Sequence, residues 1–400
     1  MSSIFAIIAL GELKAQTSKS PEAFLVDAKL LETNKTKIKK GDKEMTKALG
    51  ELRRDADAAL KNGPYTIVTK TKLPPSGDKH DYMSVGPYWW PDSTKANGLP
   101  YIRRDGVVNP ERHGVKDADD LKLLGRDVKL LGMAYYFTND EKYAQHARVL
   151  LRTWFLDKET KMNPHLKYGQ AIPGVTEGRG IGIIDTKCMV DVIDGVQLIR
   201  NSKSWSEADH KELQSWFGEF LDWMLTSPIG KDEADEHNNH GVYYDLQVVS
   251  MCLFLGNKEQ AKKILQEQTI PRIESQINED GSQPHELART KSWGYATMNL
   301  KGFFGLARLG EWAGVDLWNY QTTGGKSIKK AFEWLLPYAA DEKSWTHQQI
   351  EEPIEWKNFV PTLRMSEAHY QIHRTKPLIT QFEKEYKNNG ISILTNSMFY

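Results

Sequence analysis

The chain has 400 residues, and 40% of them are hydrophobic, which is enough to bury a large core in one domain or two. Lys plus Arg equals Asp plus Glu at 53 each, so no overall field of either sign would attract nucleic acid or an anionic membrane. An anionic partner must therefore be held by a local group of side chains. Twelve Trp and sixteen Tyr fit a carbohydrate cleft or a helical core equally well.

The N-terminus carries an apolar run, Ile4–Leu10, followed by Lys14-Ala15-Gln16. This pattern is typical of the end of a secretory signal, and the run is too short to span a bilayer. Only Met1-Ser2-Ser3 precedes it, so the usual positive segment is missing. We expect residues 1–15 to be a truncated signal peptide, residues 16–400 to form one domain, and the mature protein to be secreted or periplasmic without membrane insertion.

Helical periodicity dominates the remainder of the chain. A charged amphipathic helix over 45–61 is stopped by Gly63-Pro64. Strand patterns are almost absent and no repeat of fixed period is present, so strict solenoids are not expected. We predict an all-α fold, an α/α toroid (an incomplete barrel of antiparallel helical hairpins) with long loops forming the cleft. Further helices are predicted at 117–137, 141–156, from about 184, and at 206–225, 239–255, 257–276, 293–312, 327–340 and 366–387.

The two cysteines, Cys188 and Cys252, both lie in apolar helical patterns. Cysteines in such patterns are usually buried thiols, so we predict neither a disulfide nor a pair of metal ligands.

Two long polar and aromatic segments interrupt the helices. Residues 66–114 are too many for a plain connector, and loops of this kind usually line a site. Trp89 and Trp90 in it either stack on a sugar ring or pin the loop to the core. The second segment covers 163–174. Its polar side chains, with the Arg that follows, either contact sugar or hydrogen-bond within the loop: His165, Tyr168, Gln170 and Arg179.

The central motif is Glu236–Asp245, which places two amides, two imidazoles and two phenols just ahead of an apolar helical stripe. The first turn of a helix offers unpaired N–H groups and a positive dipole end, so it favours an anion. Asn is also a preferred N-cap, and on this segment alone capping is the competing interpretation. A second segment, 284–295, supplies a cation and a phenol through Arg289 and Tyr295. We interpret the anion as a sugar carboxylate.

These residue types suit the cleavage of a polyuronate by β-elimination. The proton on C5 is weakly acidic because it lies next to a carboxylate, so that carboxylate must first be neutralised, by Asn239 and Arg289. A free Tyr has a pKa of about 10, which a neighbouring Arg289 or Lys291 could lower. His240 is near neutrality without help. Tyr295 would then serve as base and acid on one face of the sugar, and His240 as base when the proton lies on the other.

The motifs resemble those of the alginate lyase superfamily. Within it the chain is similar to polysaccharide lyase family five, whose fold is an α/α toroid, and more similar to the neighbouring family thirty-eight. The resemblance covers about 73–373. It is carried by Asn238-Asn239-His240 with the aromatic pair after it, Glu286-Leu287-Ala288-Arg289 with Tyr295, the Gly-rich approach to Asp185, and Tyr88-Trp89-Trp90-Pro91-Asp92.

The resemblance implies an alginate lyase that needs no cofactor and no metal, with alginate or a related polyuronate as its partner. Asn239 would bind the uronate carboxylate, and His240 would assist neutralisation or act as base. Arg289 would neutralise the charge of the uronate carboxylate and lower the pKa of Tyr295. Tyr295 would be the general acid and is also a candidate base. Tyr244 and Lys291 join the candidates for substrate binding.

One departure separates the chain from family five, where the Arg and Tyr stand one residue further apart and Ser occupies the position of Gly241. The substrate preference of family five therefore does not transfer.

Four alternatives stay open at this point. The chain could be a lyase for glucuronan, a glycoside hydrolase with two carboxylates across the cleft, or a non-catalytic glycan-binding protein. A metal site is the fourth, because His237 and His240 are three apart and His285-Glu286 could add ligands. The acids before the helix either serve such chemistry or form a solvated loop: Asp232, Glu233, Asp235 and Glu236.

Overall fold

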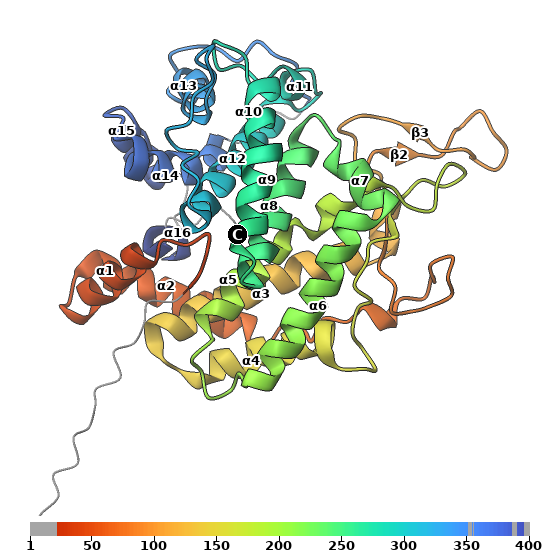
Figure 1. Ribbon diagram of the computed structural model, residues 1–400, viewed down its shortest axis with the longest axis horizontal. Coiled ribbons are helices and arrows are strands. Elements are labelled where there is room, and N and C mark those ends of the chain that lie inside the picture. Colours follow the sequence, from red (N-terminus) through yellow and green to blue (C-terminus); the bar gives the residue numbers. More distant parts are fainter. Residues whose placement is uncertain (1–21, 351–353, 355, 386–389, 396–400) are drawn as a thin grey trace, which may run out of the picture.

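The computed structural model describes residues 22–350, 354, 356–385 and 390–395. The predicted signal peptide at 1–15 lies outside the described residues. Of the described residues, 61% are helical and 4% lie in strands, which confirms the all-α prediction. Figure 1 shows the helices following one another round the molecule, from α1 and α2 (red) through α4 and α6 to α13 and α15 (blue). This is the predicted α/α toroid.

Most predicted helices are present with bounds close to those expected. The apolar stripes that predicted them face the core, as in α3, where Leu121, Leu124 and Val128 are completely buried. The helices that match are α2 (Lys43–Ala59), α3 (Asp117–Thr138), α4 (Glu141–Leu151), α5 (Met189–Leu198), α6 (Glu207–Thr226), α8 (Asn239–Phe254), α9 (Lys258–Ile264), α10 (Ile270–Gln276), α12 (Ser292–Ala313) and α13 (Ile328–Ala339).

The structure corrects the helix predictions at several places. The single helix expected over 366–387 is wrong, because Gln371 adopts a left-handed conformation (φ 49°) and separates α14 (Val360–Tyr370) from α15 (Thr375–Glu385). One π-helical turn at 265–269 lies between α9 and α10. Four helices were not predicted: α1 (Ala28–Lys39), α7 (Pro228–Ala234), α11 (Pro284–Leu287) and α16 (Gly390–Thr395).

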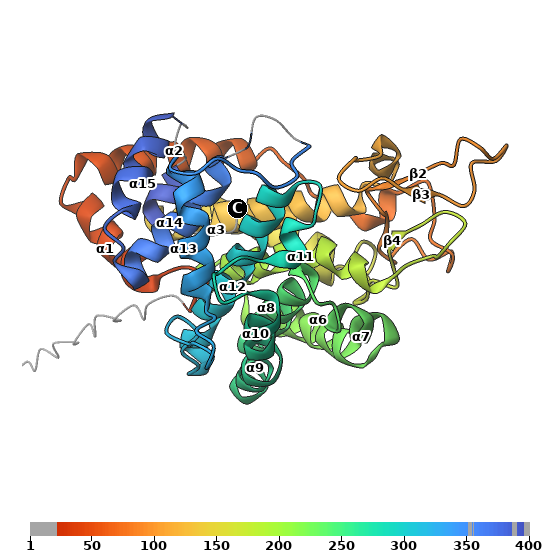
Figure 2. The ribbon, with the colours of Figure 1, turned by 90° about the horizontal axis from the view of Figure 1, so that it is seen from above.

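The two long polar segments are irregular, as predicted, and they meet through short strands. In the first, β1 (Met83–Val85) runs parallel to β4 (Tyr168–Ala171) of the second. The first also forms a hairpin of β2 (Trp89–Trp90) and β3 (Ile102–Arg103). Figure 2 shows this hairpin projecting beside β4 at one end of the molecule, far from α1. The pairing therefore gathers both aromatic loops at one place.

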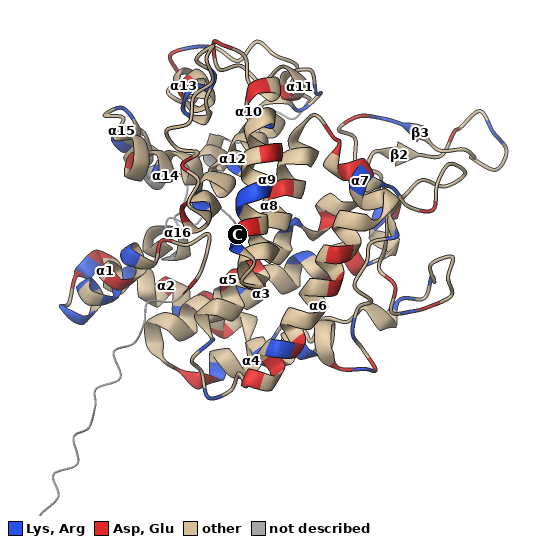
Figure 3. Cartoon of the chain, in the orientation of Figure 1, with Lys and Arg blue, Asp and Glu red and all other residues tan. Residues whose placement is uncertain are grey.

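The surface agrees with the balanced composition. Figure 3 shows that Lys and Arg positions (blue) and Asp and Glu positions (red) are mixed along the helices. Among the described helices, none is long and apolar enough to cross a membrane. Both cysteines are thiols; Cys252 is buried and Cys188 half-buried.

A buried ion pair fixes the start of α8, the helix that carries the central motif. Nε of Arg272 on α10 donates to Oδ2 of Asp245 at 2.9 Å, and both side chains are buried. Its two Nη groups donate to the backbone carbonyl oxygens of Ala234 and Glu236, just ahead of the helix. The same arginine explains Gly241, because a Cβ there would lie 2.1 Å from Nη1 of Arg272.

Replacing Arg272 should therefore destabilise the fold. Arg272→Ala leaves the carboxylate of Asp245 buried without its cation, and we expect the free energy of unfolding to fall by about 3–5 kcal/mol. Urea denaturation followed by circular dichroism measures it. Lys263→Ala is the control, since Lys263 makes an exposed pair with Glu267 at 3.9 Å, and it should change stability by less than about 0.5 kcal/mol. Equal losses for both variants would contradict this account.

Candidate active site

The first turn of α8 divides capping and site formation between its two asparagines. Asn238 is the N-cap, and its side-chain oxygen accepts a hydrogen bond from the backbone N–H of His240 at 2.9 Å. Asn239 instead donates from its backbone N–H and its amide to the two oxygens of Glu286, at 2.7 and 2.8 Å. Because Glu286 lies on α11, the two motifs that the sequence singled out are in direct contact.

Asn239 is more enclosed than the sequence analysis expected. Its side chain is completely buried, and its Oδ1 has no hydrogen-bond partner among the described residues. Glu286 is buried as well, and burial raises the pKa of its carboxyl against the opposing effect of the Asn239 hydrogen bonds. The amide can touch a sugar carboxylate only after the groups that cover it move.

His240 stands at the same helix start with 13% of its side chain exposed. Its Nδ1 lies 2.8 Å from Oε1 of Glu233, which α7 supplies. Burial lowers the pKa of His240 to about 4, and the positive charges of Arg179 and Arg289 act in the same direction. The imidazole is therefore neutral at neutral pH, and it can donate or accept one hydrogen bond at each nitrogen but adds no charge.

Arg289 and Tyr295 form the second half of the site. Nη2 of Arg289 donates to the phenol oxygen of Tyr295 at 2.7 Å, and the guanidinium carbon lies 3.8 Å from the centre of the phenol ring. The hydroxyl of Tyr88, from the loop before β2, lies 2.9 Å from the same phenol oxygen. Asp105 after β3 accepts from Arg289 at 2.8 Å. The long aromatic loop thus closes over this pair.

The electrostatics of Tyr295 differ from the expectation. Burial raises its pKa well above the ordinary value, and the neighbouring Tyr88 adds to the rise. Arg289 lowers the pKa as expected, but its effect is the smaller one. The pKa of Asp105 goes the other way: burial would raise it, yet the hydrogen bonds from Arg289 and Thr290 hold it well below its usual range. The free site therefore contains the protonated phenol of Tyr295 beside Arg289, whose charge is balanced by the carboxylate of Asp105.

Arg179 provides a second guanidinium with a different environment. Its Nη2 donates to Oε1 of Gln170 at 3.0 Å and its Nε to the backbone oxygen of Gln170 at 3.2 Å, while Gln170 donates to Asp185. Within the described part of the chain, Arg179 makes no ion pair with a carboxylate. Its guanidinium lies 5.8 Å from the ring of Trp89. Burial lowers its pKa, and the nearby charge of Arg103 adds to this.

The other predicted sugar contacts are placed as follows. Tyr168 is buried and packs with Met83 and Val115. His165 lies 3.0 Å from Asp81. The indole N–H of Trp90 donates to the backbone oxygen of Val107, whereas Trp89 is half-buried beside Arg179.

Tyr244, another candidate for substrate binding, lies in the core of the molecule. The residue is only 4% exposed, and its hydroxyl donates to the backbone oxygen of Met224. Lys291, in contrast, is half-buried just before α12, two residues after Arg289.

The side chains considered as metal ligands make contacts with other protein groups. The rings of His237 and His285 meet edge to face with centroids 4.7 Å apart, and Glu286 is bonded to Asn239. Over the described ranges, no group of three or more His, Cys, Asp and Glu has the arrangement of a metal site.

Sequence reasoning missed three residues of the site: Tyr88, Asp105 and Glu233. Tyr88 stood in a motif used only for the resemblance. Asp105 carried no signal, because its contact with Arg289 spans 184 residues. Glu233 was named only among the acids before the helix, which were left open between a catalytic or metal role and a solvated loop, because α7 was not predicted.

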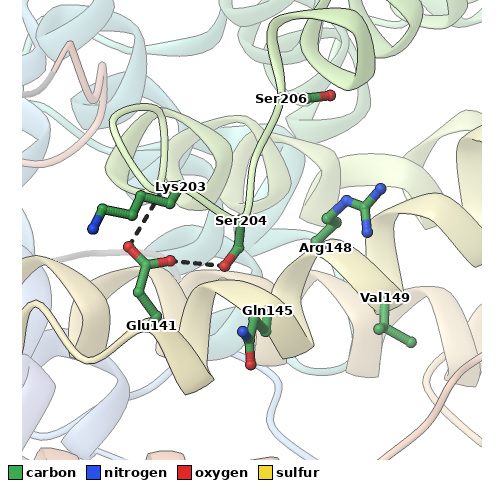
Figure 4. A pocket seen from close by; sticks show the side chains of 7 residues that line it. All are labelled: Glu141, Gln145, Arg148, Val149, Lys203, Ser204 and Ser206. Atoms are coloured by element: carbon green, nitrogen blue, oxygen red, sulfur yellow. Dashed lines mark hydrogen bonds between the residues drawn. The ribbon is translucent and has the colours of Figure 1, made fainter.

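An open pocket of about 670 Å³ lies elsewhere, along α4 and the segment that leads into α6 (Figure 4). In it, Glu141 is held by Ser204 and by the backbone of Lys203. None of the predicted site residues lines this pocket.

The family model described as alginate lyase matches residues 66–345, more than half of the chain. The chain belongs to the alginate lyase family. It is therefore a polysaccharide lyase. The match includes the aromatic loops, both helix starts and all four residues of the predicted catalytic set.

Solved alginate lyases share the fold. A crystal structure of an alginate lyase from Bacteroides ovatus is 40% identical, with a TM-score of 0.89, and the match covers 94% of this chain and 100% of that one. Alginate lyase A1-III from Sphingomonas species A1 is 16% identical, with a TM-score of 0.58 and coverage of 91% and 92%. A variant of A1-III complexed with a tetrasaccharide gives 16% identity, a TM-score of 0.59 and 90% coverage of both chains. A search of curated proteins found no match.

The charge state of His240 can be tested directly. Unfolded His has a pKa of about 6.5, and the folded value is about 4. Charging His240 therefore opposes folding: its contribution to stability is present above pH 6.5 and declines as the pH falls from 6.5 towards 4. We expect a nitrogen-15 NMR titration of the His240 ring to stay in the neutral form down to about pH 5. A midpoint at or above the unfolded value would contradict the burial of the ring.

Proposed function

We propose that this alginate lyase family member cleaves alginate by β-elimination, with Tyr295 giving a proton to the leaving oxygen. The observation that carries the proposal is the Arg289–Tyr295 pair, joined by a 2.7 Å hydrogen bond and reached by the hydroxyl of Tyr88. A base removes the proton on C5, the electron pair forms the C4–C5 double bond, and the bond from C4 to the bridging oxygen breaks. That oxygen takes the phenol proton of Tyr295 while the base holds the proton from C5, so atoms and charge balance.

The raised pKa of Tyr295 supports its role as the acid. Because burial keeps the phenol protonated, a proton is available when the leaving oxygen develops negative charge. Arg289 then stabilises the phenolate that remains, and this contribution grows as the reaction proceeds. Tyr88 at 2.9 Å offers a route by which the phenol exchanges its proton. When Tyr295 also acts as base, it must enter the cycle as the phenolate, which the same Arg289 contact favours.

Neutralisation of the sugar carboxylate is assigned to Arg179, with the neutral His240 donating a hydrogen bond to the same carboxylate. Arg289 is compensated by Asp105 at 2.8 Å, whereas Arg179 binds only oxygens of Gln170 among the described residues. The backbone N–H of Gly180, the residue after Arg179, donates to Asp232 of α7 at 3.1 Å, and the charge of Arg179 affects the pKa of both His240 and Glu233. A guanidinium without a carboxylate partner gains most from an incoming carboxylate. Asn239 would add a hydrogen bond once uncovered.

The hydrolase alternative finds less support in these contacts. Hydrolysis needs one carboxylic acid and one carboxylate free to act across the bond. Here Glu286 is hydrogen-bonded to Asn239, and Asp105 is hydrogen-bonded to Arg289.

We also propose that the protein is exported to the periplasm or the medium. This rests on the apolar run Ile4–Leu10, and N-terminal sequencing of the mature protein tests it.

Changing Tyr295→Phe tests the proposed acid. We expect kcat on alginate to fall by about 10²- to 10⁴-fold, because the leaving oxygen loses its proton donor, while binding of alginate oligosaccharides is retained. Ultraviolet absorbance of the unsaturated product measures turnover, and calorimetry measures binding.

Tyr101→Phe is the matched control, since Tyr101 belongs to the same long loop but bonds to Glu111 instead of Arg289. The control should turn over like the unchanged protein. Full turnover by the Tyr295→Phe variant, or products that lack a double bond, would refute the proposal.

A further inference from the structure

Glu233 is a buried carboxyl that the proposed mechanism does not use. It lies on α7, its side chain is 1% exposed, and its Oε1 is 2.8 Å from Nδ1 of His240. Its second oxygen, Oε2, has no hydrogen-bond partner among the described residues. An ionised carboxylate needs several donors when it is buried, and this one has the imidazole alone.

The surroundings of the Glu233–His240 pair disfavour charge on both partners. For Glu233, burial raises the pKa, and the negative charges of the surrounding acids raise it further. The positive charge of Arg179 lowers it, but has a smaller effect. For His240, burial is again the largest effect and lowers the pKa. The charged groups that act on the pair come from α7 and its end, the segment before α5, and α11 with the residues that follow it: Asp232, Glu236, Arg179, Asp185, Glu286 and Arg289.

We propose that Glu233 is a positioning residue whose protonated carboxyl donates to Nδ1 of His240, so that Nε2 carries the ring proton as a donor for substrate. A neutral imidazole holds one proton, and the partner of one nitrogen decides which nitrogen has it. A carboxyl O–H on Nδ1 leaves the proton on Nε2. The target of Nε2 as a sugar carboxylate rests on the proposed function; the tautomer itself does not.

In this tautomer His240 can act as a hydrogen-bond donor but not as a base. With a proton on Nε2, the ring can donate to a carboxylate oxygen, but it has no lone pair there to remove a proton from carbon. His240 becomes a base only after the Glu233–His240 pair loses one proton. Glu233 is then a carboxylate that accepts a hydrogen bond from Nδ1–H, and Nε2 carries a lone pair. In the neutral pair His240 therefore cannot be the base, and removal of the C5 proton then requires another base, such as the phenolate of Tyr295.

Three variants test the proposal: Glu233→Gln, Glu233→Ala and the control Asp235→Asn. The amide of Gln can donate to Nδ1 as the protonated carboxyl does, so Glu233→Gln should retain most of kcat. Glu233→Ala frees the ring and should lower kcat by about 10- to 100-fold, as loss of an orienting partner does elsewhere. Asp235 is exposed at the end of α7 and its variant should behave like the unchanged protein.

Nitrogen-15 NMR of the His240 ring at neutral pH supplies a readout that a merely structural role would not move. We expect the Nε2–H tautomer in the unchanged protein and in Glu233→Gln. A ring protonated on Nδ1, equal losses in the Gln and Ala variants, or no loss in either would overturn the proposal. If the unchanged protein cleaves no polyuronate, the proposed function fails, and the ring tautomer still decides this inference.

Discussion

The site depends on one buried carboxylate, that of Glu286, which accepts hydrogen bonds from the backbone and the amide of Asn239. Residues 47 positions apart are thereby held together, and the start of α8 is fixed against α11. Arg289 follows three residues later and Tyr295 six after that, so their distance from His240 is set by the same contact. A buried carboxylate bonded in this way resists displacement because both donors would lose their partner.

Burial then assigns the chemical state of each group. The imidazole of His240 becomes neutral and the phenol of Tyr295 stays protonated, while Arg289 is compensated by Asp105. Of the two site arginines, Arg289 and Arg179, Arg179 makes no ion pair with a carboxylate among the described residues. An acidic sugar would complete this arrangement, since it brings the missing negative charge. The free site therefore carries a positive charge, on Arg179, that a negatively charged sugar would balance.

The sequence predicts the parts of the structure that are encoded locally. Apolar residues at helical spacing located α3, α8 and α12, and the helix start with its amides and imidazole was recognised from residue types. Short helices stabilised by tertiary contacts escaped, because their own residues carry no apolar stripe: α7 has seven residues and begins on a Ser227-Pro228 cap. Glu233 was missed for that reason.

Long-range contacts and burial could not be read from the chain. Nothing near Asp105 indicates a partner 184 residues away. The sequence also does not show the direction in which Tyr244 leaves α8, and that direction brings its hydroxyl to the backbone oxygen of Met224. The sign of the pKa shift at Tyr295 also needed the structure, because the sequence shows the nearby Arg289 but not the burial that outweighs it.

The most direct test of the central claim is a crystal structure of the Tyr295→Phe variant with a uronate oligosaccharide bound. The account predicts one sugar carboxylate within hydrogen-bond distance of the Arg179 guanidinium and of Nε2 of His240, with the bridging oxygen facing position 295. An oligosaccharide bound with its carboxylates away from both groups, or with its bridging oxygen away from position 295, would contradict it.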